Sequence, residues 1–248
     1  MLSYVQSSLF IIAAMVLSIV TVAVLNRLWP ISKRKLVNDV TGWQLGILGT
    51  TYGVILGFML YTVWNDFRTA EVNTNLEASS LLTVSRTGAG LASPDREAIH
   101  AMALKYAEVA INEEWPLMQV QQDSNASQRV VVDMWKVVTE MKPGGGNGAD
   151  HLANALKELS ERRNLREQEL RDRLPKILWL LLLAGAGATV GSACLLGNDN
   201  EWLHYCQVLA LTFVVSVTLA SIADLARPFE GAVSVTPVAF ERALTLMR

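Results

Sequence analysis

A glycine-striped apolar segment, residues 43–70, constrains the fold of this chain more than any other feature. Four glycines recur in it every three or four residues: Gly46, Gly49, Gly53 and Gly57. In a helix these positions share one face. Each glycine lowers the stability of a helix in water by roughly 1 kcal/mol relative to alanine. In lipid, a face of glycines lets two helices approach closely, which can offset that cost. The segment runs into polar residues 65–71 without a further Gly or any Pro. We therefore predict a membrane-spanning helix that continues beyond the bilayer.

Composition and hydropathy predict an all-α integral membrane protein with four transmembrane helices. Of the 248 residues, 51% are apolar and only 18% are charged, which favours several membrane spans. Apolar runs long enough to cross a hydrocarbon core of about 30 Å occupy residues 7–29, 43–64, 176–197 and 202–223. The first run has no basic residue before it and no convincing cleavage site after it, so we predict a retained helix.

These runs divide the chain into four parts. Residues 1–65 hold the first two spans, 66–174 form a helical soluble insert, 175–226 hold the last two spans, and 227–248 form a tail with a short amphipathic helix. The insert contains 13 Lys and Arg against 17 Asp and Glu, an ordinary solvated surface that gives no sign of nucleic-acid binding. Within the insert, Ser93 before Pro94 predicts a helix N-cap, and the glycines at 143–148 predict a linker.

The charges beside the spans bear on orientation. Arginines and lysines flank both ends of the insert, and the loop 198–201 has no basic residue, which places the insert and both termini in the cytoplasm. The short basic loop Lys33, Arg34 and Lys35 argues for the reverse. We predict the first orientation, in a bacterial inner membrane.

Catalytic and cofactor motifs are missing from the sequence. It contains no P-loop, no glycine-rich dinucleotide motif after a strand, no HExxH, no CxxC and no nucleophile elbow. His204 and Cys206 have a spacing that two metal ligands can adopt, but an interfacial histidine is the simpler interpretation. We predict no enzyme, no catalytic residue, no cofactor and no metal site.

Several short motifs resemble a known family. Leu56-Gly57-Phe58 followed by Val63-Trp64-Asn65 resembles the pore-lining second helix of the bestrophins. The turn formed by Pro228, Phe229 and Gly231 resembles the one after their fourth helix. Together with Glu77-Ala78 and Glu114-Trp115-Pro116, these motifs resemble more closely a bestrophin-like membrane protein family of unknown function, over most of the chain.

The resemblance implies a homo-oligomeric, pentameric anion channel whose second helices face a common axis. In bestrophins, apolar side chains four residues apart form a neck on that helix, and Thr50, Val54 and Phe58 take these positions here. Thr50 and Val54 are smaller than the bulky neck residues of that family, so the neck is wider or absent. No acidic cluster follows Gly231, so gating by calcium is not expected.

The residues themselves give a compatible reading. Thr51, Phe58 and Thr62 share a helix face that suits a pore, because apolar rings gate by dewetting and hydroxyls replace part of an ion's hydration. Thr50 and Val54 lie progressively to one side of this face, and supercoiling of the helix brings the two sets together. The alternative reading of this face is packing against another span.

The leading hypothesis is an oligomeric ion channel in the lipid bilayer, selective for anions such as chloride. Its pore residues are Thr50, Thr51, Val54, Phe58 and Thr62. The glycines of the second span, with Gly187 and Gly191 in the third, are predicted to pack helices together. The alternative is a non-conducting membrane scaffold or stress-sensing protein whose helical insert binds a partner.

Overall fold

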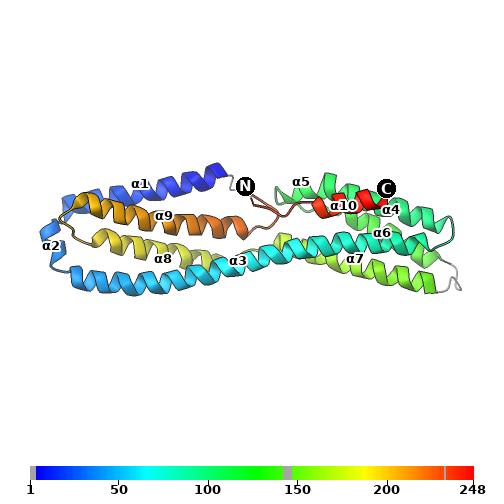
Figure 1. Ribbon diagram of the computed structural model, residues 1–248, viewed down its shortest axis with the longest axis horizontal. Coiled ribbons are helices and arrows are strands. Elements are labelled where there is room, and N and C mark those ends of the chain that lie inside the picture. The colour runs from blue at the N-terminus through cyan, green and yellow to red at the C-terminus, as the bar shows by residue number, and fades with distance from the viewer. Residues whose placement is uncertain (1–3, 142–146, 232) are drawn as a thin grey trace. The chain divides into compact units, whose positions relative to one another are not determined.

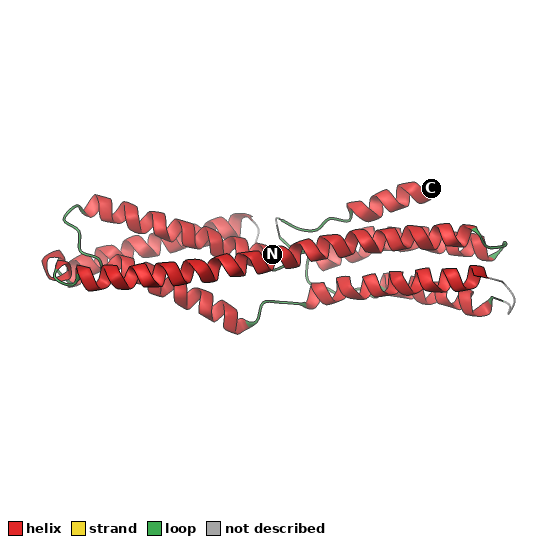
Figure 2. Ribbon diagram, turned by 60° about the horizontal axis from the view of Figure 1, so that its bottom comes forward, coloured by secondary structure: helices red, strands yellow, loops and turns green. Residues whose placement is uncertain are grey.

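The computed structural model describes residues 4–141, 147–231 and 233–248, and within them the chain forms helices and no strand (Figure 2). Four helices are long and apolar enough to cross a membrane: α1 (Tyr4–Leu28), α3 (Asn38–Ala89), α8 (Lys176–Leu195) and α9 (Glu201–Leu225) (Figure 1). The prediction of an all-α protein with four membrane spans is confirmed. The linker predicted at residues 143–148 falls mostly outside the described residues.

The helices form two units, each with its own core. The membrane unit comprises the described residues up to Asn65 together with 173–226, and the insert unit comprises 66–172 together with 227–248. Helix α3 belongs to both, because it continues unbroken from Asn38 to Ala89. Trp43 and Trp64, both exposed, are 21 residues apart on this helix, which corresponds to about 32 Å of rise and matches the hydrocarbon thickness.

In the membrane unit, α3 packs through one side chain against a glycine of α8. Tyr52 is 5% exposed, and its hydroxyl donates a hydrogen bond to the carbonyl oxygen of Leu182 at 2.8 Å. A Cβ atom at Gly185 would lie 2.5 Å from a ring carbon of Tyr52, so only glycine allows this contact. By contrast, a Cβ at Gly187 or Gly191 would meet no atom within 4 Å.

One end of the membrane unit is closed by polar contacts between two loops. Arg34, in the short helix α2 (Ile31–Lys35), is fully buried and donates to the carbonyl oxygens of Cys194 at 3.2 Å and Leu196 at 3.4 Å. The guanidinium thereby satisfies carbonyls at the C-terminus of α8, where a helix favours a cation. Lys35 forms an ion pair with Asp199. Two of the three basic residues of this loop are therefore engaged within the unit.

The insert unit is a helical bundle. Besides the end of α3 it contains α4 (Asp95–Val109), a π-helical turn (Ala110–Glu114), α5 (Trp115–Met118), α6 (Ala126–Glu140), α7 (Asn147–Arg171) and α10 (Val238–Met247). The amphipathic helix α10 buries Phe240 completely, with ring centroids 6.3 Å from Tyr106 and 5.6 Å from Trp115. The tail therefore completes the core of the insert unit.

The predicted N-cap at Ser93 is wrong. Helix α4 begins at Asp95 and its capping position is Pro94, with no side-chain hydrogen bond to the backbone. The hydroxyl of Ser93 donates instead to the carboxylate of Glu97 at 2.7 Å. Because the helix begins two residues after Ser93, its hydroxyl contacts a carboxylate of the first turn and does not cap the backbone.

Candidate functional site

Helix α3 has a buried face and an exposed face within the membrane unit. Tyr52, Leu56 and Val63 are at most 8% exposed and form a core with residues of α8 and α9. Val54 lies about 160° around the helix from Leu56, and it is 53% exposed, while Phe58 is 70% exposed. The side of α3 that faces away from the unit's core therefore carries a large aromatic residue.

All five residues predicted to line a pore are exposed: Thr50, Thr51, Val54, Phe58 and Thr62. Thr50, Val54 and Phe58 are centred opposite the buried face, and Thr51 and Thr62 flank them on one side. The hydroxyls of Thr50 and Thr62 donate to the carbonyl oxygens of Gly46 at 2.8 Å and Phe58 at 2.9 Å. Because these bonds lie within the helix, the face is compatible with either lipid or an ion path. Lining of a pore stays a prediction.

The glycine stripe lies on the other flank of this face. A Cβ atom built at Gly46, Gly49, Gly53 or Gly57 would meet no atom within 4 Å. Within the described part of one chain, these glycines therefore make no close helix contact. Their predicted role in helix packing requires a second copy of the chain.

The insert unit holds a buried charge cluster around Arg166, which we call the Arg166 cluster: Glu77, Glu114, Ser127, Arg163 and Arg166. Arg166 is 2% exposed, and its Nε and Nη2 atoms donate to the carboxylate of Glu77 at 2.7 and 3.1 Å. Nη2 also donates to the carboxylate of Glu114 at 2.7 Å. The guanidinium thus joins α3 and α7 to the π-helical turn.

The remaining atoms of the Arg166 cluster are also satisfied. Ser127 donates to Glu114 through its backbone N–H at 3.0 Å and its hydroxyl at 2.6 Å. Arg163 Nε donates to the hydroxyl oxygen of Ser127 at 2.6 Å. Burial raises the pKa of Glu114, but the charge of Arg166 and the hydrogen bonds from Ser127 outweigh it, so the pKa of Glu114 is lowered. The carboxylate of Glu114 is ionised at neutral pH.

Sequence reasoning missed this cluster, although α7 carries a signal for it. Leu152, Leu156 and Leu159 are fully buried, and Arg163 and Arg166 continue the same spacing of four and three residues. Two arginines at core positions of a helix require buried acidic partners. The charge of the insert as a whole instead predicts an ordinary solvated surface.

The turn that resembles the bestrophin motif packs into the insert unit. Phe229 is 1% exposed and meets the ring of Trp115 edge-on at 6.0 Å. The indole N–H of Trp115 donates to the carbonyl oxygen of Val235 at 3.0 Å. Gly231 has a φ of 82°, which favours glycine. Among the described residues, no group of three or more His, Cys, Asp or Glu is placed to hold a metal ion.

Glu169 gives the insert unit an expected pH dependence. Burial raises its pKa, a hydrogen bond from Asn73 opposes the rise, and the charge of Glu77 adds to it. Because the folded pKa is above the ordinary value of 4.5, the protonated form stabilises the fold, and stability is lost as pH rises through the folded pKa. We expect the melting temperature of Glu169→Gln to depend less on pH above 4.5 than that of the wild type. Thermal unfolding of both proteins from pH 4.5 to 8 measures this, and parallel curves would contradict it.

Comparison with known proteins gives a family and a fold. Residues 12–240 match the bestrophin-like domain. No curated protein sequence matches the chain. A substituted bacterial bestrophin homologue from Klebsiella pneumoniae superposes with a TM-score of 0.74 at 14% identity, over 96% of this chain and 98% of that chain. Another variant gives 0.72 at 13% over 98% of both chains, and a crystal structure of a membrane protein gives 0.73 at 14% over 96% and 97%. At these identities the structures show a shared fold.

Proposed function

This chain belongs to the bestrophin-like family of membrane proteins, and from that membership we propose that it forms an anion channel whose α3 helices line the pore. Its motifs predicted membership of this family, and the match over residues 12–240 confirms that prediction. The observation that carries the proposal is the exposed face of α3, where Thr50, Val54 and Phe58 lie opposite the buried face.

A ring of identical copies explains this face. If α3 helices surround a common axis, Phe58 of each copy contributes to an apolar constriction that gates by dewetting. The open glycine flank lets neighbouring α3 helices approach closely. Residues 43–64 contain no Asp or Glu, so this part of the pore has no carboxylate ring of the kind that selects cations. We propose a pentamer, as the family resemblance implies.

We further propose that the insert and both termini lie in the cytoplasm. The basic loop between the first two spans was the main argument for the reverse orientation. Arg34 is fully buried and Lys35 pairs with Asp199, so Lys33 is the one exposed basic residue of that loop without an ion pair among the described residues. The loop therefore presents only one unpaired positive charge, and it is a weaker argument for the reverse orientation.

Replacement of the proposed constriction tests the channel. Phe58→Ala removes an aromatic side chain that is 70% exposed on this face of α3, so we expect chloride flux into liposomes to rise on the order of tenfold, equivalent to a barrier lower by about 1.4 kcal/mol. Phe213→Ala is the matched control. Phe213 is also an exposed phenylalanine, at 49%, but it lies on α9 and not on the proposed pore helix α3. Its flux should equal that of the wild type.

The mass of the purified particle is measured on the same samples. A pentamer-sized particle with the expected flux supports the proposal. Normal assembly with equal flux from the wild type and Phe58→Ala would contradict a neck at Phe58. A monomer or dimer that passes no chloride would favour the scaffold alternative and direct attention to the insert unit.

A further inference from the structure

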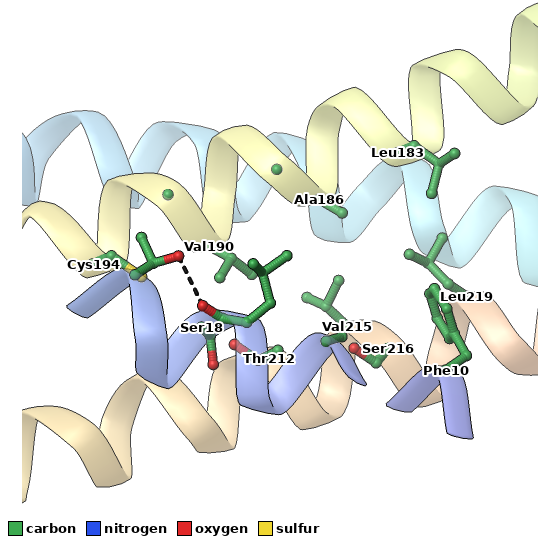
Figure 3. Close-up of a pocket in the computed structure, with 15 residues that line it drawn as sticks. Phe10, Ser18, Leu183, Ala186, Val190, Cys194, Thr212, Val215, Ser216 and Leu219 are labelled. Carbon is green, nitrogen blue, oxygen red and sulfur yellow. Dashed lines mark hydrogen bonds between the residues drawn. The ribbon is translucent and has the colours of Figure 1, made fainter. Parts of the chain in front are cut away.

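The membrane unit contains a pocket of about 410 Å³ between α1, α8 and α9 (Figure 3). No residue of α3 lines it, so it is separate from the proposed pore face. Phe10, Leu183 and Leu219 lie at one end, and Cys194 lies at the other. The pocket is therefore formed by α1, α8 and α9 alone among the four membrane spans.

The pocket is long and owes its width to small side chains. Its lining on α1 extends from Phe10 to Thr21, which lie eleven positions or about 16 Å apart along the helix. Ala14 contributes to it from α1, and Gly187 and Gly191 contribute from α8. A Cβ atom at either glycine would meet no atom within 4 Å, so the hollow is bounded there by backbone.

The chemistry of the lining restricts the occupant. Among the residues that the structure describes, none that lines the pocket is charged. The hydroxyls of Ser18, Thr21 and Thr212 donate to backbone carbonyls of their own helices at 2.7–2.8 Å. Ser216 differs, because it is 3% exposed, faces the pocket and has no hydrogen-bond partner among the described residues (Figure 3). The pocket thus offers an occupant a long apolar wall and, at Ser216, one hydroxyl whose donor is not used within the described residues.

We propose that this pocket binds an acyl chain of a membrane lipid. Water is a poor occupant, because a buried water needs two to four polar partners and most of this wall consists of apolar side chains and glycines. A charged ligand would lie in the membrane without a counter-charge, which is costly. An acyl chain is elongated and apolar, it is the surrounding solvent of the membrane unit, and the volume lies within the range of ligand pockets.

A helix from a second copy is the competing occupant. With side chains, a helix is about 10–12 Å across, and the walls of the pocket are three helices already in mutual contact, so a whole helix would have to push them apart. A lipid chain enters such a space without separating the helices. The two occupants are distinguished by a lipid probe that labels the protein covalently.

Photolabelling of the full-length protein in nanodiscs tests the proposal. The probe is a phosphatidylcholine with a diazirine on its acyl chain, mixed into phosphatidylethanolamine, and labelled peptides are quantified by mass spectrometry. Within residues 10–21 and 212–219, we expect labelling of the buried lining residues Ser18, Thr212, Val215 and Ser216, in addition to positions exposed to the surrounding lipid. Ala14→Leu and Gly187→Leu fill the pocket from opposite walls, and each should lower this labelling about fivefold or more.

Two neighbouring substitutions serve as controls. Ala13→Leu on α1 and Ala188→Leu on α8 add the same side chain at exposed positions outside the pocket, so they should leave labelling unchanged. Gel filtration shows whether each pocket variant is folded. If one of them misfolds, the other still tests the proposal. Wild-type protein unlabelled at these peptides, or folded pocket variants labelled as strongly as the controls, would overturn the proposal. The readout is labelling and not flux, so it stands apart from the channel test.

Discussion

Arg166→Ala is expected to destabilise the insert unit by about 3–5 kcal/mol. It leaves the buried carboxylate of Glu77 without a cation, and it leaves that of Glu114 with only Arg163, at 3.6 Å. Glu77 is fully buried and Glu114 is 3% exposed. Both carboxylates accept hydrogen bonds from Arg166, at 2.7–3.1 Å. The loss corresponds to a fall in melting temperature on the order of 6–20 °C for a chain of this size.

Arg162→Ala is the control for this prediction. Arg162 lies on the same helix and forms an exposed pair with Glu158 at 3.9 Å, which contributes little to stability. Differential scanning fluorimetry of the full-length variants in detergent measures both shifts. If Arg166→Ala melts within about 2 °C of Arg162→Ala, the cluster does not stabilise the fold as described.

Gly185→Val is expected to destabilise the membrane unit by about 1–3 kcal/mol, the usual cost of overpacking. Even the Cβ atom of valine would overlap the ring of Tyr52, at 2.5 Å. The ring has little freedom to move away, because its hydroxyl is hydrogen-bonded to the carbonyl oxygen of Leu182 at 2.8 Å. We expect α3 and α8 to separate locally and the protein to melt several degrees lower.

Gly187→Ala distinguishes this contact from a general intolerance of larger side chains on α8. Its added Cβ would lie in open space, so no loss of stability is expected and helix propensity favours alanine. Melting temperatures and cross-linking between cysteines placed on α3 and α8 provide the readouts. Equal losses in both variants would refute the specific role of Gly185.

The spans of this fold were predictable from sequence, because the bilayer requires long apolar runs whose length is visible in one dimension. The exposed face of α3 was predictable in part, since helical spacing assigns Thr51, Phe58 and Thr62 to one side. Its centre at Val54 depends on which side packs against α8 and α9. Tyr52 lies on the side of α3 that packs, and its contact residue Gly185 on α8 lies far away in the sequence.

The polar contacts were harder to predict. The sequence predicts Arg34 to be part of a solvated basic loop, but its side chain is buried against the end of α8. Arg166 reads as part of a charged surface helix, yet it lies in the core. In both cases the polar partners that accompany burial include groups far away in the sequence, such as Cys194 for Arg34 and Glu77 for Arg166. Local spacing cannot supply such partners.

The place of α10 in the core of the insert unit imposes an order on synthesis. Phe229, Phe240 and Met247 are core residues of a unit whose other helices end at Arg171. A ribosome therefore completes the last two spans before it releases these side chains. At about 5–20 residues per second, the 55 residues from 172 to 226 take roughly 3–11 s. During that interval the nascent insert exposes the apolar surface that α10 later covers, so chaperone binding is expected to be strongest in this window.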